Sequence, residues 1–404
     1  MEHVRTVVVG GGQAGLSVSR ELTRAAVEHV VLERGRVGET WRGRWDTFCL
    51  VTPNWSVQLP GHPYDGSDPD GFMPRDAIVA YLERFATAAR VPVREGVVVE
   101  GLDPLPGGGF HVRTDAGPLR ADSVVLATGT YRRPHRPPAA AEMPSDLLQL
   151  DVVDYSNAAA LPTGRVLVVG SGQSGCQLAE ELHVAGREVV LACGRAPWFP
   201  RRVAGRDLVW WLVESGFFDA TAATLPTPAA RLQSNFLTSG HGGGHDLHLR
   251  TLRALGVTLV GRFIGVSGRR ARFAADLAAN VAWGDERYTQ LCGLLRKVAD
   301  ERGLELPDPA PPPPFDPAAP EEVDLAGFGA VLFAGGFRPD FRSSIPRAEA
   351  FDDLGFPIQR EGTSSVVPGL HFVGVHFQRK RKSSLLCGVG EDAAIVARTV
   401  AAGA

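Results

Sequence analysis

The sequence of 404 residues has few cysteines, little net charge and no long hydrophobic run. Its five cysteines are an odd number, and none of them forms the Cys-x-x-Cys pair typical of zinc sites, iron–sulfur clusters or redox disulfides. No apolar stretch reaches the roughly 18 residues that a membrane span needs, and a strand-like run begins too early to leave room for a signal peptide. We therefore expect a cytoplasmic protein with neither a metal site nor a membrane partner.

The charge balance narrows the classes of partner. A formal net charge of −3 and a pI near 6.4 offer nothing that would attract nucleic acid. Hydrophobic residues at 44% and charged residues at 22% are ordinary for a globular protein and argue against a disordered or collagen-like chain. We expect small-molecule partners and, from the length, two or three structural units.

Strand-like and helix-like patterns alternate at the start of the chain and again near its middle. Residues 6–10 form a β-branched run that ends in glycine, a helical pattern follows over 14–26, and a second apolar run spans 29–33. The same order restarts at 165–170. We expect an α/β fold with two doubly wound, Rossmann-like dinucleotide-binding domains, the second inserted into the first.

Later segments set the expected domain boundaries. Residues 305–320 hold eight prolines in sixteen positions, which predicts a stiff connector. The strand-like runs at 329–336 and 370–375 and the helical pattern at 392–401 are expected to complete the first unit. The predicted domains are residues 1–158 with 324–404, and 159–323 with a variable substrate-side insertion at about 196–320.

A glycine-rich turn near the N-terminus has the Gly-x-Gly-x-x-Gly pattern, and it follows a strand and opens a helix. Glycine permits the tight turn and lets a pyrophosphate approach the N-terminus of the helix. Glu33 ends the next strand, where its carboxylate would accept hydrogen bonds from an adenosine ribose. The alternative is a glycine-rich turn without a ligand. The predicted binding residues of this turn are Gly10, Gly12, Gln13, Ala14 and Gly15.

A second turn of the same pattern follows the strand-like run at 165–169. Its following strand ends at Arg195 and not at an acid, so Arg195 would meet the 2′-phosphate of NADPH, with a solvated loop arginine as the alternative. Two dinucleotide folds in one chain suggest an electron relay, in which one holds FAD and the other brings NADPH. The predicted binding residues of the second turn are Gly170, Gly172, Gln173, Ser174 and Gly175.

These two turns, with the segments Trp41–Asp46, Leu59–Gly61, Ala127–Gly129 and Gly335–Asp340, resemble those of class B flavoprotein monooxygenases. The resemblance is to the flavin-containing and indole-3-pyruvate types and to a bacterial flavin-dependent oxidoreductase branch. It implies FAD on the discontinuous domain and NADPH on the inserted one. It also implies a reduced flavin that adds O2 to form a C4a-hydroperoxyflavin, which oxygenates a small nitrogen- or sulfur-containing substrate.

The same resemblance assigns further cofactor residues. Trp41 would line the isoalloxazine, and Thr128 with Gly129 would approach the FAD diphosphate or ribose. Gly388 and Gly390 would open a helix whose positive N-terminus faces the flavin N1–C2=O locus, where negative charge settles on reduction. Arg34, next to Glu33, completes the predicted FAD-binding set.

Two departures from the family bear on oxygenation. The family's F-x-G-x-x-x-H-x-x-x-(Tyr/Phe) signature corresponds to residues 145–155, where only Tyr155 matches. Val51 stands two residues before Pro53, where relatives have Asn or His, and the nearby Asn54 is the substitute. The candidate catalytic residues are therefore Asn54 and Tyr155, with the capping of a turn as the other role for Asn54.

These departures keep other activities open. The first alternative is an NADPH-dependent flavin dehydrogenase or oxidase that accumulates no hydroperoxide. Baeyer–Villiger oxidation and oxidative decarboxylation lie within the family's chemistry, and a non-catalytic redox-responsive binding protein is a third interpretation. A homodimer is left open.

Two clusters are interpreted as loops. His241, His245 and His248 have the spacing of helical metal ligands, but three glycines between the first two favour a flexible loop near the nicotinamide or substrate. The basic run Arg379–Lys382 is expected to be a solvated loop or a phosphate-facing clamp, not a nucleic-acid patch.

Overall fold

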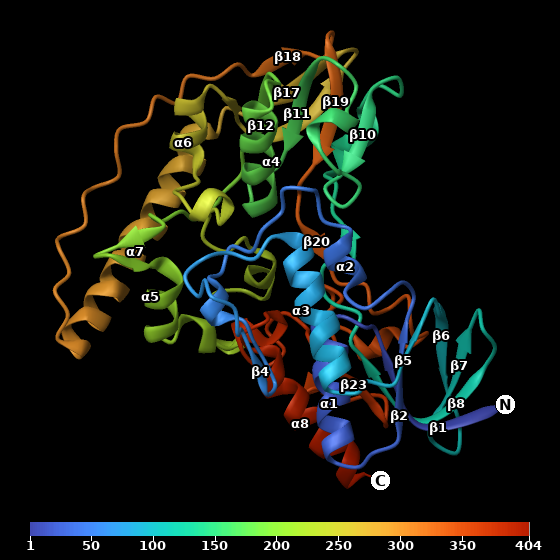
Figure 1. Cartoon of the computed structure of the whole chain (residues 1–404). Helices are drawn as coiled ribbons and strands as arrows, with labels where there is room; N and C mark the ends of the chain where they lie inside the picture. Colours follow the sequence, from blue (N-terminus) through green and yellow to red (C-terminus); the bar gives the residue numbers. More distant parts are fainter. Residues whose placement is uncertain (404) are drawn as a thin grey trace.

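Two β-sheets, one above the other in Figure 1, form the centres of the two units in the computed structural model, which describes residues 1–403. The upper sheet is parallel throughout, and the lower sheet has a parallel centre with antiparallel strands beside it. The strand order is β21-β22-β23-β8-β1-β2-β5 in the lower sheet and β10-β19-β11-β12-β15 in the upper sheet. Along this order the strands of the lower sheet are β1 (Glu2–Val9), β2 (His29–Glu33), β5 (Val93–Glu95), β8 (Leu119–Leu126), β21 (Gln359–Arg360), β22 (Thr363–Ser364) and β23 (Leu370–Phe372). Two further strands of the same sheet, at 99–104 and 110–114, form an antiparallel pair that is joined to β8.

The lower unit has three layers because its central strands are apolar on both faces. Val8 of β1 faces a helical layer, whereas its neighbours Val7 and Val9 face the opposite layer. That opposite layer contains the antiparallel pair β6–β7 and the segment around Phe341. The elements added here are α1 (Gln13–Arg24), α3 (Arg75–Ala88), α8 (Val389–Ala402), β6 (Val99–Pro104) and β7 (Phe110–Thr114).

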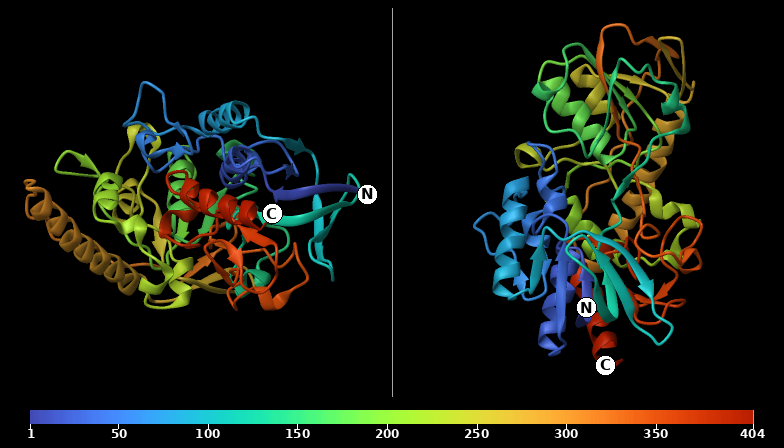
Figure 2. Two further views of the ribbon diagram at one scale, coloured as in Figure 1. Left: turned by 90° about the horizontal axis from the view of Figure 1, so that it is seen from below. Right: turned by 90° about the vertical axis from the view of Figure 1, so that its right-hand side faces the viewer.

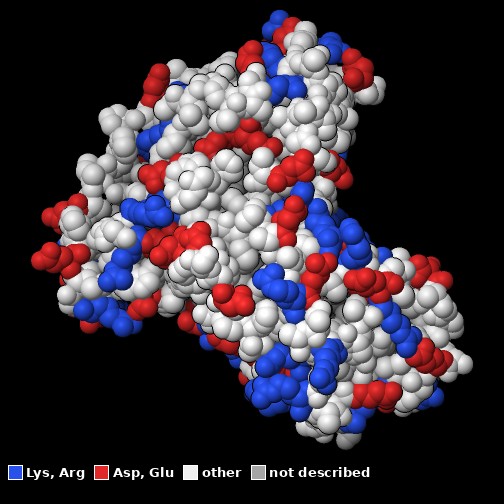
Figure 3. Space-filling model, viewed as in Figure 1, with Lys and Arg blue, Asp and Glu red and all other residues white. Residues whose placement is uncertain are grey.

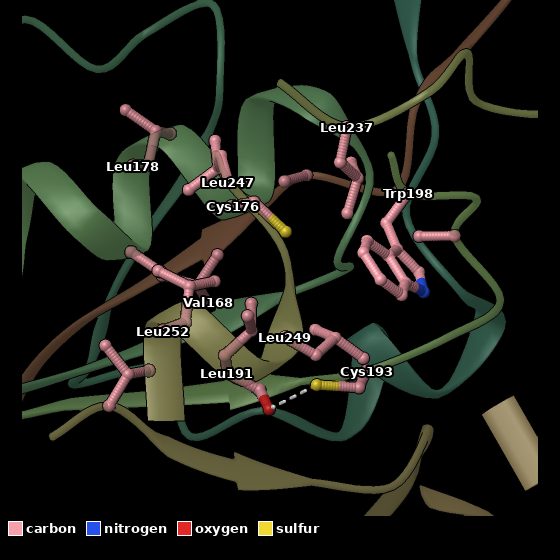
Figure 4. Packing of buried hydrophobic residues seen from close by; sticks show 14 of the residues in the cluster. Val168, Cys176, Leu178, Leu191, Cys193, Trp198, Leu237, Leu247, Leu249 and Leu252 are labelled. Carbon is pink, nitrogen blue, oxygen red and sulfur yellow. Dashed lines mark hydrogen bonds between the residues drawn. The ribbon is translucent and has the colours of Figure 1, made fainter. Parts of the chain in front are cut away.

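The upper unit repeats this plan. Val168 packs with α4, α6 and α7, and Figure 4 shows it in one core with Cys176 and Leu252. Its neighbours Leu167 and Val169 pack against a small antiparallel sheet of β16, β17 and β18. The elements are β10 (Leu148–Asp151), β11 (Arg165–Val169), β12 (Val189–Ala192), β15 (Thr258–Val260), β19 (Phe328–Phe333), β16 (Phe263–Ser267), β17 (Arg270–Phe273), β18 (Glu322–Asp324), α4 (Gln173–Val184), α6 (Leu249–Leu255) and α7 (Leu277–Arg302).

The predicted α/β class with Rossmann-type parallel sheets is confirmed. The covering of the sheets differs from a doubly wound arrangement in one respect. Helices lie on one face of each sheet, and a small antiparallel sheet covers the other face. Both layers bury apolar side chains, which is the physical requirement that a buried parallel sheet imposes.

The sheets also depart from the expected domain boundaries. Strands β10 and β19 were expected in the first unit, but both pair in the second sheet, with β19 between β10 and β11. A fully apolar strand such as β19 fits the centre of either sheet, so its composition alone could not assign it. The chain passes between the two units at β9 (Arg133–Pro134) and again at β20 (Phe337–Arg338), and these two short strands pair antiparallel.

The region between 196 and 320 contains one long helix and an extended segment. Helix α7 begins at Leu277, and buried Asn280, Val281 and Gly284 form the start of its packed face. The proline-rich segment has no regular structure and is tied to α7, where Tyr288 Oη donates to the Ala310 carbonyl (2.7 Å). Figure 2 shows α7 along the side of the molecule farthest from the N-terminus.

The remaining short elements are α2 (Glu39–Arg42), β3 (Gln58–Leu59), β4 (His62–Pro63), β13 (Arg202–Val203), β14 (Arg206–Asp207) and α5 (Leu208–Glu214). The chain begins and ends in the lower unit (Figure 1). Within residues 1–403, no helix combines the length and the apolarity needed to cross a membrane.

Candidate functional site

The first glycine-rich turn leaves an open space at the N-terminus of α1. Gly10 has a φ of +112°, and a Cβ on Gly15 would lie 1.8 Å from the Gly10 carbonyl oxygen, so both positions require glycine for the turn itself. Gly12 differs, because a Cβ there would meet nothing within 4 Å. The free N–H groups at this end of α1 therefore face a space that suits an anion such as a diphosphate.

Glu33 lies where the sequence predicted, at the end of β2 beside this turn. It is 8% exposed and accepts hydrogen bonds from Gly11 N–H (2.6 Å) and Gly35 N–H (2.9 Å). Each carboxylate oxygen has a second acceptor site, so the group can also accept from a ribose hydroxyl. The adjacent Arg34 is exposed.

Arg132 is a site residue that sequence reasoning missed. Burial lowers the pKa of its guanidinium, and the nearby Arg34 lowers it further, while Asp340 and Glu33 oppose both effects. Two guanidinium groups and two carboxylates thus lie near one another beside the first turn. The basic composition of the connector after Gly129 was the only available signal.

The surroundings of Thr128 and Gly129 also suit a bound dinucleotide. The Thr128 hydroxyl is buried and has no hydrogen-bond partner among the described residues, a costly state unless something else binds it. Gly129 has a φ of +80°, and a Cβ there would meet nothing within 4 Å. An open backbone beside an unsatisfied hydroxyl fits the sugar or phosphate of a dinucleotide.

Gln13 has a different role from the one that its position in the turn suggested. Its side-chain oxygen accepts from Trp41 Nε1 (3.0 Å), and its Nε2 donates to the Ser384 carbonyl (3.2 Å). Gln13 therefore clamps two distant segments around the open space. Trp41, predicted to line the flavin, is fixed through this clamp.

The N-terminus of α8 is closed by packing and ion pairs. A Cβ on Gly388 would lie 2.4 Å from the Lys382 carbonyl, and one on Gly390 would lie 2.9 Å from Pro60 Cγ, so both glycines permit close contacts. The basic run is neither solvated nor a free phosphate clamp, which corrects both expectations. Its ion pairs are Arg379–Asp392, Arg379–Glu391, Lys380–Glu391, Lys380–Asp219, Lys382–Glu391 and Lys382–Asp219.

The second glycine-rich turn has the same backbone but is covered. A Cβ on Gly175 would lie 1.8 Å from the Gly170 carbonyl oxygen, as in the first turn. Over Gly172, however, Ser234 Oγ lies 3.9 Å from the position of a Cβ. Gln173 exchanges two side-chain hydrogen bonds with the Thr238 backbone. The space at α4 is thus bounded by a segment of the insertion.

Arg195 lies at the loop after β12, as the sequence predicted. Its side chain is exposed, and it forms no ion pair within residues 1–403. Beside it, Ser171 Oγ and the Gly194 backbone exchange two hydrogen bonds, which hold the loop against the turn at α4. The guanidinium is therefore free to meet an anionic group.

Comparisons with known proteins agree with this geometry. The family model of pyridine nucleotide-disulphide oxidoreductases matches residues 7–207. An uncharacterized CzcO-like oxidoreductase of Geobacillus kaustophilus is 29% identical and covers 97% of each chain. Indole-3-pyruvate monooxygenase YUCCA1 of Oryza sativa is 33% identical over 50% of this chain and 56% of its own. A variant of the flavin monooxygenase of Stenotrophomonas maltophilia superposes with a TM-score of 0.72 at 21% identity, over 100% of this chain and 99% of its own.

The chain is an oxidoreductase that is similar to flavin monooxygenases. The resemblance that the motifs predicted is therefore confirmed, and so is the prediction of an enzyme. In this oxidoreductase the first glycine-rich turn lies in the lower unit, after β1, and the second lies in the upper unit, after β11.

Asn54 braces a loop in the oxidoreductase. It is 3% exposed, its Nδ2 donates to the Asp68 carbonyl (2.9 Å), and its Oδ1 accepts from Met73 N–H (2.7 Å). Both ends of the amide are thus used within the loop at 54–73. Of the two roles that the sequence left open for Asn54, the geometry favours the structural one.

Tyr155 joins the two units of the oxidoreductase. It is 1% exposed, and its hydroxyl donates to Glu181 Oε1 (2.7 Å), while Thr47 binds the other carboxylate oxygen. Burial raises the pKa of Tyr155, and the Glu181 carboxylate raises it further, so the phenol stays protonated. This arrangement holds α4 against the segment 38–75 of the first unit, called the aromatic loop because it contains Trp41, Trp45 and Trp55.

The histidine cluster does not converge. His245 Nε2 lies 2.8 Å from Glu180 Oε1, and buried His248 caps α6 through a hydrogen bond from Thr251 N–H (3.3 Å). Across residues 1–403, no three His, Cys, Asp or Glu side chains gather as a metal site requires. Gly242, with a φ of 60°, interrupts the helical turn at His241–Gly243, as the run of three glycines predicted.

A buried His376 near Ser384 was also missed. Its Nδ1 lies 3.4 Å from Ser384 Oγ, and Ser384 is the residue whose carbonyl Gln13 binds. Burial lowers the pKa of His376 to about 4, with smaller contributions from Arg381 and Arg231, so the ring is neutral at pH 7. No sequence pattern links these residues, because they meet only through the fold.

The surface has no large patch of one charge on the face shown in Figure 3, where acidic and basic side chains are interspersed. The outline is hollowed between the upper and lower units. This distribution fits the small net charge of the oxidoreductase.

Proposed function

We propose that this oxidoreductase is an NADPH-dependent FAD monooxygenase that oxygenates a small nitrogen- or sulfur-containing nucleophile. The observation that supports it is the presence in one chain of two dinucleotide turns, the first facing an open space next to the unsatisfied Thr128 hydroxyl. The likeness to flavin-containing and indole-3-pyruvate monooxygenases supports the reaction class.

The chain's own residues would place the two cofactors. The N-terminus of α1 would receive the FAD diphosphate, Glu33 would accept from the ribose, and the Thr128 hydroxyl would gain its missing partner. The N-terminus of α4 would receive the NADPH diphosphate, and Arg195 would bind the 2′-phosphate.

FAD would supply the redox chemistry when bound. Held by these residues, it would provide a hydride acceptor for NADPH and a two-electron donor for O2, so that one oxygen atom would enter the substrate and the other would leave as water. The protein's part is to orient the two cofactors and to exclude water from the reacting oxygen. Trp41, clamped by Gln13, would form one wall of that space.

A second candidate function is an NADPH-dependent flavin dehydrogenase or oxidase that accumulates no hydroperoxide. The geometry of Asn54 favours it, because both ends of the only candidate amide in the loop are engaged in the loop itself. Val51 at the neighbouring position has no hydrogen-bonding side chain. A hydroperoxide would then lack that source of stabilisation.

Stopped-flow spectroscopy separates the two candidates. The purified protein, with FAD bound, is reduced by NADPH without oxygen and then mixed with oxygenated buffer while the flavin spectrum is recorded. A transient distinct from reduced and oxidised flavin supports the monooxygenase. A direct return to oxidised flavin, both with and without a panel of amines and thiols, supports the oxidase. A colourless protein that binds no added FAD contradicts both.

A further inference from the structure

Arg201 is a buried charge at the junction of three segments. It is 2% exposed, its Nε donates to Asp207 Oδ2 (2.7 Å), and its guanidinium lies 4.2 Å from the centre of the Phe72 ring. Its Nη1 donates both to the Val51 carbonyl (2.7 Å) in the first unit and to Thr238 Oγ1 (3.0 Å) in the insertion. Burying a guanidinium costs desolvation free energy, and the hydrogen bonds and ion pair of Arg201 offset that cost.

Thr238 belongs to a segment, here called the strap (Gln233–Gly240), that bounds the second turn. Gln173, directly after Gly172 in the turn, bonds the backbone N–H and carbonyl of Thr238. Leu237 anchors the strap in the core of the upper unit, where Figure 4 shows it beside Trp198. Ser234 borders the space beside Gly172, where its Cβ lies 3.8 Å from the position of a Cβ, whereas the equivalent Gly12 of the first turn has no such neighbour.

Val51 belongs to the aromatic loop of the first unit. A Cβ on Gly240 at the end of the strap would lie 2.0 Å from the Leu50 carbonyl oxygen, so the two segments are in direct contact. The loop reaches Trp41 through Phe48, whose ring centre is 5.9 Å from that of Trp41. Trp41 in turn is bonded to Gln13 of the first turn.

We infer that Arg201 is a positioning residue that couples occupancy of the second dinucleotide site to the aromatic loop at the first. This inference rests on the proposed function for the identity of the two cofactors. A diphosphate at α4 would lie next to Ser234, so that its binding would engage the strap. Thr238 moves with the strap, and Arg201 passes the change to the Val51 carbonyl. The coupling is reciprocal by thermodynamic necessity.

The test uses the FAD-loaded protein and NADP⁺ as the probe. Binding of NADP⁺ is measured by calorimetry, which does not depend on the flavin, and the change in the visible flavin spectrum is recorded at saturation. The variants are Arg201→Met, Arg201→Lys and Thr238→Val. Arg202→Met is the matched control, because Arg202 is the exposed neighbour that contacts only the Gly243 carbonyl.

We expect NADP⁺ to change the flavin spectrum equally in the wild type and in Arg202→Met. In Arg201→Met the amplitude should fall at least about fivefold although NADP⁺ still binds, because the link between the sites is lost. Arg201→Lys should restore part of the amplitude by keeping the charge and one donor. Thr238→Val replaces only the hydroxyl with a methyl group and should also reduce the amplitude. It tests the coupling if Arg201→Met fails to fold.

Other results overturn the inference. Full amplitude in both Arg201→Met and Thr238→Val, or an equal loss in Arg202→Met, would show that Arg201 does not couple the sites. A wild type that binds both cofactors without any spectral change removes the coupling but leaves the proposed function intact. A wild type that holds FAD but does not bind NADP⁺ contradicts the proposed function and the inference together.

Discussion

Gly12 and Gly15 occupy one turn, but their surroundings differ, and this gives a prediction at the scale of single residues. Gly12→Val should abolish FAD retention and leave the melting temperature of the FAD-free protein nearly unchanged, because its side chain would enter only the open space at α1. Gly15→Ala should fail to fold, because its Cβ would lie 1.8 Å from the Gly10 carbonyl oxygen. Bound FAD per chain and thermal unfolding measure both effects.

The comparison between the two variants is the control. A Gly12→Val protein that is yellow, with one FAD per chain, would contradict the placement of FAD at the first turn. A stable Gly15→Ala protein would contradict the close approach between Gly15 and Gly10.

Arg195 provides a second prediction at this scale. Arg195→Ala should raise the Michaelis constant for NADPH by about tenfold, the effect of losing one charged hydrogen bond of roughly 1.4 kcal/mol. The constant for NADH should stay the same, because NADH has no 2′-phosphate. Arg398→Ala, which removes an exposed arginine at the far end of α8, is the control for the change in net charge. An equal effect on NADH and NADPH would exclude Arg195 as the phosphate partner.

At the scale of elements, the first turn of α8 depends on a buried ion pair. Asp392 is 2% exposed and accepts from Arg379 Nε at 2.7 Å. Burial raises the pKa of Asp392, and the hydrogen bonds from Ser383 and Arg379 oppose that effect. Arg379→Met should lower the free energy of unfolding by about 3 kcal/mol, because it leaves a buried carboxylate without its cation.

Asp392→Asn is the informative comparison for this pair. It removes the buried charge while keeping an acceptor for Arg379, so it should cost clearly less than Arg379→Met. Urea denaturation at pH 7 measures both values. If Arg379→Met is as stable as the wild type, the pair does not stabilise the start of α8.

At the scale of the whole molecule, three buried histidines predict sensitivity to acid. Burial lowers the pKa of His248, His371 and His376 from 6.5 to about 4 in each case. Between about pH 4 and pH 6.5, the unfolded chain therefore binds more protons at these histidines than the folded chain does. The stability contribution is complete above pH 6.5 and is lost as the pH falls towards 4, at up to about 1.4 kcal/mol per pH unit for each histidine.

The slope of the unfolding free energy against pH measures this effect. In His248→Asn the slope between about pH 4.5 and 6 should fall by up to about 1.4 kcal/mol per pH unit, because one titrating group is gone while asparagine still caps α6. An unchanged slope in this variant would mean that His248 does not titrate as its burial requires.

The sequence by itself determined the features that depend on neighbours along the chain. A strand, a glycine turn and the first turn of a helix lie within about 25 residues, so Gly10, Glu33 and the class of fold could be predicted from local pattern. Arg195 belongs to the same group, since its place after β12 follows from the repeat. Their roles in binding remain predictions that the experiments above test.

Only the tertiary structure decided the features that join distant segments. Gln13 meets Ser384 across 371 positions, and Arg201 meets Val51 across 150, so no periodicity or motif could reveal either contact. The same reason explains why β19 could not be assigned to a sheet, since an apolar strand satisfies either one. Local sequence fixes which groups can bind a dinucleotide, whereas packing between remote segments fixes which side chains are free to do so and which are already engaged.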